Sequence, residues 1–155
     1  VEAQHMYFVV GGLMNYALTD DQDDVVSEEK LLPGEAWLSE PALWAHWKHV
    51  GIFTALQESQ LLCVQISTFG QIIRDDDSSK RMAANYARKF MAFLNKKDSD
   101  ELSDTVCNDI EATAELQECL PTMTRSTKNR VSQMSMAPEM KKSMSNKMKS
   151  WLWFS

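Results

Sequence analysis

The fold of this chain is decided by the stretch LPGEAWLSEPALWAHWKHVGIFTAL, residues 32–56. It opens on Pro33-Gly34, a pair typical of tight turns, because proline presets φ and glycine tolerates positive φ. It closes on the apolar run of residues 52–56, and a second β-type run follows at residues 61–66 after a polar turn. A turn, a tryptophan-rich segment and two short strands in this order indicate a mainly β domain.

Upstream of this stretch, residues 6–18 are rich in Tyr, Phe, Val and Leu, which favours further strands. Gly11-Gly12 interrupts them, so we expect a turn or bulge there between two strands. Residues 19–30 are acidic and polar, and we interpret them as a solvated hairpin loop before a short strand at Leu31-Leu32. Because a strand-like run follows Val1 almost at once, we interpret the chain as a fragment whose first elements precede it.

Downstream of this stretch, the pattern changes from strands to helices. Ser67 is a candidate N-cap for a short helix that includes Phe69 and Ile73. Acidic residues within 75–79 begin a longer helix, since negative charge is favourable at a helix N-terminus. This helix is expected to end near Lys97, and its apolar residues recur three or four apart as Met82, Tyr86, Phe90, Phe93 and Leu94.

Three regions of the chain differ sharply in charge. Residues 1–97 hold 13 acidic and 9 basic side chains, and we predict that they form the folded domain. Residues 98–120 hold 8 acids and no base, and Asp98 and Glu101 have the spacing of a capping box, so we expect an acidic helix. Residues 121–155 hold 7 bases and one acid and are interpreted as a low-complexity tail. Because the folded part is acidic, we exclude nucleic acid as a partner.

Composition and motifs favour a cytoplasmic protein that is not an enzyme. The three cysteines are scattered and odd in number, which favours free thiols in a reducing compartment. The sequence shows neither a signal peptide nor an apolar run of about 18 residues, the length that a membrane span needs. The soluble end of a membrane protein remains compatible with this pattern. The motifs of serine hydrolases, P-loop enzymes and zinc proteases do not occur in the sequence.

Three segments resemble, in order and spacing, the cyclic-nucleotide-binding domain family of the catabolite activator protein, protein kinase A regulatory subunits and cyclic-nucleotide-gated channels. Residues 6–13, MYFVVGGL, resemble a strand motif of this family. Residues 32–40 resemble the approach to its phosphate-binding cassette, and residues 50–69 resemble the two strands and the helix start that follow. The resemblance covers residues 5–95 and implies a jelly-roll β-roll with C-terminal helices (α+β), whose first strands would precede residue 1.

The same resemblance assigns a ligand site for cAMP or cGMP. Glu40 matches the position that binds the ribose hydroxyl, and His49 stands where the family has a phosphate-binding arginine. Ser39 replaces a glycine, and Pro41 removes one backbone N–H from the phosphate cradle. Losing the bidentate, permanently charged arginine costs about 1.5–3 kcal/mol of binding free energy, so we expect a degenerate pocket. The predicted ligand-binding residues are Leu38, Ser39, Glu40, Ala42, His49 and Val50.

Each of these residues also has a structural interpretation. Glu40 would then accept hydrogen bonds from loop backbone, and His49 would be a histidine at the rim of the domain. Lys48, next to His49, is expected to point to the opposite face, because adjacent strand residues alternate. The three tryptophans of this region are expected to serve packing rather than base stacking: Trp37, Trp44 and Trp47.

Two functions follow for the domain, and a third concerns the tail. The domain is either a ligand-responsive regulatory domain of an ion channel or kinase regulator, or a nucleotide-independent scaffold for protein interaction or dimerisation. In the first, the helix of residues 79–95 would close over the ligand; in the second, the C-terminal helices would form a homo-oligomer.

The basic segment 138–155 carries methionines and tryptophans, so it either forms a helix on an anionic membrane or on calmodulin, or is a disordered terminus. No cofactor is expected apart from the cyclic nucleotide as a ligand.

Overall fold

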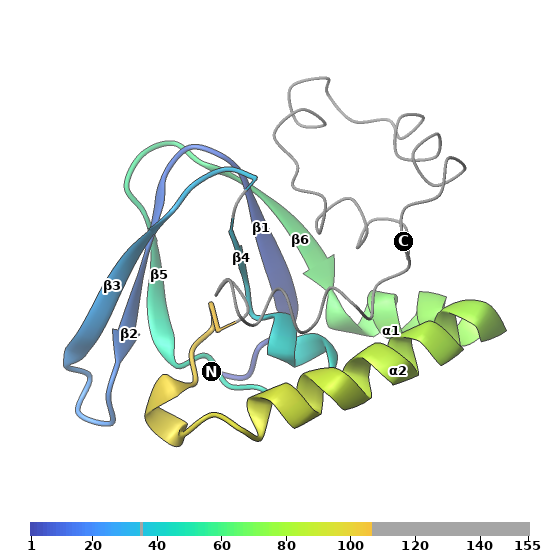
Figure 1. Ribbon diagram of the computed structural model, residues 1–155. Coiled ribbons are helices and arrows are strands. Elements are labelled where there is room, and N and C mark those ends of the chain that lie inside the picture. The colour runs from blue at the N-terminus through green and yellow to red at the C-terminus, as the bar shows by residue number, and fades with distance from the viewer. Residues whose placement is uncertain (35, 107–155) are drawn as a thin grey trace.

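The computed structural model describes residues 1–34 and 36–106 (Figure 1). One sheet has the strand order β4-β1-β6 and consists of β1 (His5–Gly11), β4 (Trp37–Leu38) and β6 (Gln60–Gln65). The other has the order β3-β2-β5 and consists of β2 (Met14–Thr19), β3 (Val25–Leu31) and β5 (Gly51–Ala55). The helices are the 3-10 turns η1 (Glu40–Leu43) and η2 (Ser99–Glu101) and the α-helices α1 (Ile66–Asp75) and α2 (Asp77–Leu94).

The predicted class, mainly β with helices after the strands, is confirmed by this arrangement. All strand pairs are antiparallel, and Gly12 has a φ of 84° at the predicted turn between β1 and β2. The two strands predicted around residues 52–66 also form. They do not pair with each other, because β5 joins β2 in one sheet and β6 joins β1 in the other.

The prediction of an acidic loop over residues 19–30 is wrong for most of that range. Residues 25–30 belong to β3, which pairs with β2, and the true turn lies between Asp20 and Asp24. The Asp20 carboxylate closes this turn by accepting the N–H of Gln22 at 2.8 Å and that of Asp24 at 3.0 Å. A strand on a solvated sheet edge forms through its backbone, so the apolar residues on which the prediction relied are not required.

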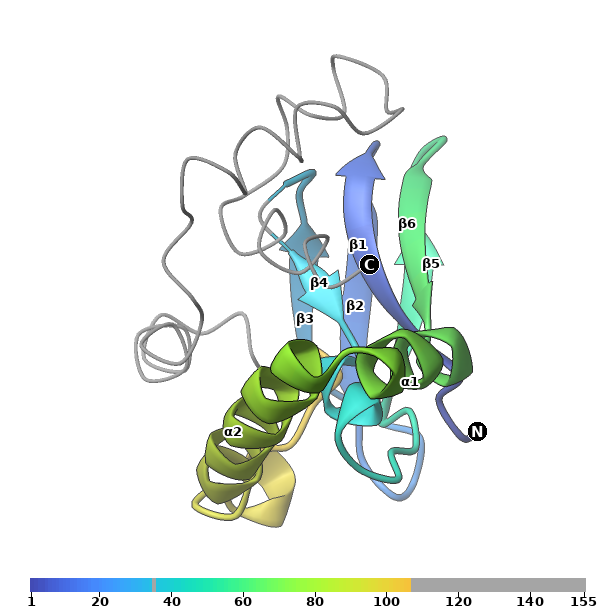
Figure 2. The ribbon, with the colours of Figure 1, turned by 90° about the vertical axis from the view of Figure 1, so that its right-hand side faces the viewer.

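The core lies on both faces of β1, because side chains alternate along a strand. Met6, Phe8 and Val10 face α1 and α2, where they join the apolar face of α2, including the fully buried Phe90. Val9 lies in a second cluster between the two sheets. Figures 1 and 2 show the two sheets opening away from each other, with both helices crossing one end of the β4-β1-β6 sheet.

Both predicted helices after β6 are present. The predicted cap at Ser67 is wrong, because α1 begins at Ile66 with Gln65 at its N-cap, two residues earlier than a Ser67 cap implies. α2 is capped by the Asp76 side chain, which accepts the N–H of Ser79 at 2.6 Å. Burial of the Phe90 and Leu94 side chains confirms the predicted apolar face of α2. No helix among the described residues combines the length and the apolarity that crossing a bilayer requires.

The chain leaves α2 through residues 98–106, which we call the strap. The capping box predicted at Asp98 and Glu101 forms, but only the short turn η2 follows it, and Leu102 is already extended. The α-helix predicted from residue 98 is therefore wrong for the strap. Asp104 and Val106 lie in this non-helical segment, and both are buried against the domain. The remainder of the predicted acidic helix and the tail 121–155, with its segment 138–155, lie outside the described residues.

Candidate anion-binding site

The site begins at Ser39, which joins β4 to η1. Its φ of 60° and ψ of 29° are left-handed, a conformation that serine adopts only when its surroundings hold it. The Ser39 N–H donates to the Asp104 carbonyl oxygen at 2.7 Å, and its hydroxyl donates to Asp104 Oδ1 at 3.0 Å. The strap thus fixes the unusual backbone of Ser39 from both its main chain and its side chain.

The Asp104 carboxylate is the centre of the site. The residue is 3 % exposed, and an ionised carboxylate at such a depth needs several donors. Five groups surround it, which we call the cradle; three lie on Oδ1 and two on Oδ2. They are Ser39 Oγ at 3.0 Å, Trp47 Nε1 at 2.8 Å and His49 Nδ1 at 3.0 Å, then the Val50 N–H at 3.1 Å and the Tyr16 hydroxyl at 3.3 Å.

Tyr16 holds the strap both as a hydrogen-bond donor and as a hydrogen-bond acceptor. Its hydroxyl donates to Asp104 Oδ2 and accepts the Asp104 N–H at 3.0 Å. Burial raises the pKa of the Tyr16 phenol well above its usual range, so the hydroxyl remains a donor at any ordinary pH. Gly51 on β5 makes room for it, since a Cβ there would lie 2.6 Å from the Tyr16 hydroxyl.

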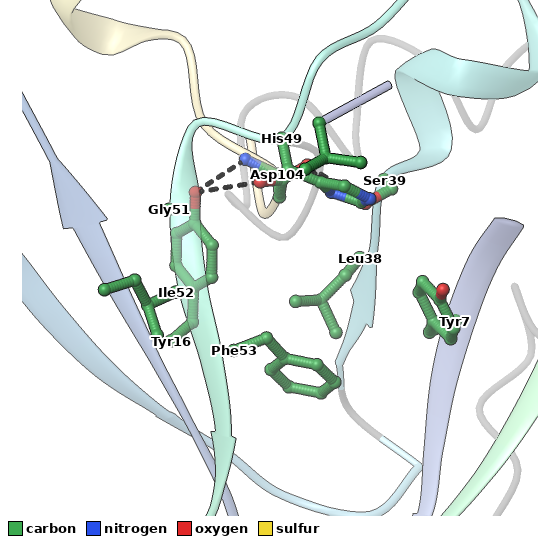
Figure 3. Close-up of a pocket in the computed structure, with 10 residues that line it drawn as sticks. Tyr7, Tyr16, Leu38, Ser39, His49, Gly51, Ile52, Phe53 and Asp104 are labelled. Atoms are coloured by element: carbon green, nitrogen blue, oxygen red, sulfur yellow. Dashed lines mark hydrogen bonds and ion pairs between the residues drawn. The ribbon is translucent and has the colours of Figure 1, made fainter. Parts of the chain in front are cut away.

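A cavity of about 430 Å³ opens beside the cradle, between the two sheets (Figure 3). Tyr7, Leu38 and Phe53 form its apolar part, and the rings of Tyr7 and Phe53 lie with their centroids 6.5 Å apart. Ser39 and Asp104 form part of its polar end. The cavity therefore combines an apolar body with a cluster of hydrogen-bonding groups at one end, as small-molecule sites do.

The structure brings four of the six predicted site residues together. Leu38, Ser39 and His49 line the cavity, and Val50 contributes its backbone N–H. Ala42 is buried in η1, where its N–H donates to the Ser39 carbonyl at 3.1 Å, and it is not among the cavity-lining residues. His49 contacts the carboxylate of the strap through Nδ1, and its assignment as a phosphate ligand stays a prediction.

Glu40 belongs to a separate network on the side of the helices. It is fully buried, its Oε2 accepts the Trp37 indole N–H at 2.7 Å, and its Oε1 accepts the Tyr86 hydroxyl. These two hydrogen bonds both come from side chains, one on β4 and one on α2. Glu40 is not among the residues that line the cavity with His49, so this structure does not present its carboxylate to a ribose there.

Trp44 and Trp47 have different roles. Trp44 packs against the core, as the packing interpretation predicted. Its ring centroid lies 5.6 Å from that of Phe69, in an edge-on arrangement, and 5.2 Å from that of Tyr86. Trp47 donates its indole N–H to Asp104, a polar role that the sequence did not suggest.

Asp104 and Tyr16 are the functional residues that sequence reasoning missed. Asp104 is one of 8 acids in residues 98–120, and nothing in its spacing separates it from the others. Tyr16 looks like any aromatic residue of a strand. Their only signal is spatial, because the hydrogen bond between them spans 88 residues of sequence.

The described residues hold no group of three or more His, Cys, Asp and Glu side chains suited to a metal ion. No protein-family model matches the chain. No curated protein matches its sequence either.

Proposed function

We propose that this chain is a regulatory domain without catalytic activity, of the cyclic-nucleotide-binding type, whose anion cradle is occupied by its own Asp104. The observation that carries this proposal is the position of the Asp104 carboxylate. It accepts hydrogen bonds from Ser39 and Val50 and contacts His49, three of the residues that the family resemblance assigned to the ligand site.

The order of the elements supports the finer assignment to a jelly-roll β-roll. β4 leads through the short turn η1 to β5, and β6 then leads directly into α1 and α2. The resemblance implied this order for the two strands after the cassette and the C-terminal helices that follow them. The cradle lies where β4 ends and β5 begins, which is where the phosphate-binding cassette of the family was expected.

Two features support a nucleotide-independent form of regulation. A tethered group has an effective concentration on the order of millimolar, so a free nucleotide must compete with an Asp104 that is always present. Glu40, the expected ribose ligand, is already bound by Trp37 and Tyr86. We therefore expect the domain to act through its strap and helices, as part of a channel or a kinase regulator, rather than by sensing cAMP or cGMP.

Calorimetric titration with cAMP and with cGMP tests this proposal. We expect no saturable heat from the unaltered chain at millimolar nucleotide. Glu40→Gln removes the carboxylate that the resemblance assigns to the ribose and serves as the control variant. Circular dichroism checks that this variant is folded. Saturable binding below millimolar that is lost in Glu40→Gln would contradict the proposal and establish the nucleotide-responsive alternative.

A further inference from the structure

The donors around Asp104 are matched to a carboxylate rather than to a phosphate. None of the five is a lysine or an arginine, and only His49 among them can become a cation. Phosphate sites typically use arginine forks or a series of helix-start N–H groups. Here the donors divide between two oxygens of one planar, singly charged group, three on Oδ1 and two on Oδ2.

The adjoining cavity defines the remainder of a ligand. Its walls beside the cradle are the rings of Tyr7 and Phe53 and the side chain of Leu38. The Tyr7 phenol is uncharged at neutral pH, and burial raises its pKa still further, so this wall carries no charge. An apolar or aromatic body fits such walls, and offset or tilted contacts with aromatic rings stabilise it further.

We propose that the site binds a small monocarboxylic acid with an aromatic body, by exchange of its carboxylate with that of Asp104. This inference rests on the proposed function, because it takes the cradle to be the regulatory site. The two carboxylates need the same donors, so only one of them can be bound at a time. Ligand binding therefore displaces the strap, and a docked strap weakens ligand binding by the same factor.

Exchange at Asp104 also releases the rest of the strap. The Ser39 N–H and the hydroxyl of Tyr16 are bonded to the Asp104 main chain, and Val106 is buried in the core beside the helices. The Thr105 hydroxyl donates to Glu29 on β3. Displacing one carboxylate thus changes how residues 98–106 are held after α2, and this is how occupancy of the cavity would be transmitted.

Asp104→Ala tests this inference by chemical rescue, with benzoate as the probe and benzamide as the uncharged control of the same shape. We expect benzoate, but not benzamide, to raise the melting temperature of Asp104→Ala and to bind it at least tenfold more tightly than it binds the unaltered chain. Asp100→Ala removes an exposed acid of η2 and is the matched variant, in which benzoate binding should stay as weak as in the unaltered chain.

The contrary outcomes are distinct. Equal binding of benzoate and benzamide to folded Asp104→Ala, or no binding of either, overturns the inference. If Asp104→Ala does not fold, the test uses Asp104→Asn, which keeps the shape of the side chain. The inference is then overturned if benzoate binds Asp104→Asn no more tightly than it binds the unaltered chain. Binding of cAMP but not benzoate to Asp104→Ala refutes only the carboxylate class. Binding of cAMP to the unaltered chain below millimolar refutes the proposed function.

Discussion

Gly51 shows how one residue shapes the site. It lies on β5 opposite Leu18 of β2, and a Cβ added to it would come within 2.5 Å of the Ala17 carbonyl oxygen and 2.6 Å of the Tyr16 ring. Real Cβ atoms do not approach so closely, so any other residue must move β2 or Tyr16. The glycine thus permits the close approach that places the Tyr16 hydroxyl on Asp104.

Gly51→Ala is therefore expected to destabilise the protein by about 1–3 kcal/mol, the usual cost of overpacking a well-packed position. Urea unfolding followed by fluorescence measures this change in the free energy of unfolding. Gly70→Ala is the matched control, because Gly70 lies inside α1 and a Cβ there meets only the far end of the Arg74 side chain, at 3.7 Å. Gly70→Ala should stabilise by about 0.5–1 kcal/mol. Equal stability of the two variants would contradict this account of Gly51.

At the scale of an element, the start of α2 depends on Asp76. Its side chain accepts the N–H of Ser79 at 2.6 Å. Hydrogen bonds from the Ser79 side chain and then from its backbone N–H lower the pKa of the Asp76 carboxyl below its usual value of 3.8. A pKa that is lower in the folded than in the unfolded chain means that the carboxylate stabilises the fold above the unfolded pKa. That contribution is lost as the pH falls through the folded pKa.

We therefore expect Asp76→Ala to lower the melting temperature at neutral pH. The difference from the unaltered chain should shrink as the pH falls below 3.8. Thermal unfolding by circular dichroism between neutral and acidic pH measures it. Asp21→Ala removes an exposed acid from the β2–β3 turn and should show no such pH-dependent difference. A difference for Asp76→Ala that is constant across this range would rule out the carboxylate as the cause.

At the scale of the whole molecule, the strap completes the domain. It buries Val106 in the core beside the helices and supplies Asp104 to the cradle between the sheets. Burying one valine contributes about 1.5 kcal/mol or more, and hydrogen bonds to a charged group contribute about 1.5–3 kcal/mol. Without the strap, the buried donors of the cradle would lose their acceptor.

A chain that ends at Lys97 is thus expected to be less stable than one that ends at Val106 by about 3 kcal/mol or more. Urea denaturation of the two shortened chains, compared with each other, measures this difference. If the two chains unfold at the same urea concentration with the same slope, the strap does not stabilise the domain, and its docking in the cradle would carry no free energy.

Two partners expected from the sequence stay predictions. Oligomer formation through the C-terminal helices is checked by sedimentation of the full chain. Binding of the 138–155 segment to anionic vesicles or to calcium-calmodulin is checked by circular dichroism of the corresponding peptide. A peptide that stays unfolded with both would exclude that function for the tail.

Sequence by itself determined the parts of this protein that depend on neighbouring residues. The turn at Gly11-Gly12, the strands on either side of residues 56–59 and the apolar face of α2 follow from periods and turn residues. The capping box at Asp98 and Glu101 was also predicted and is present. These signals are local, because a cap or a turn is made by residues three or four apart.

Only the tertiary structure decided how the site is assembled. It separated Glu40 from His49 by placing one carboxylate against Trp37 and Tyr86 and the imidazole against Asp104. It also made residues 98–106, the first part of the expected acidic helix, a strap that fills the cradle. The contacts responsible span 46, 55 and 88 residues of sequence. The physical reason is that a buried carboxylate is stabilised by whichever donors the packed sheets bring to it, and no local pattern records which acid among many will enter.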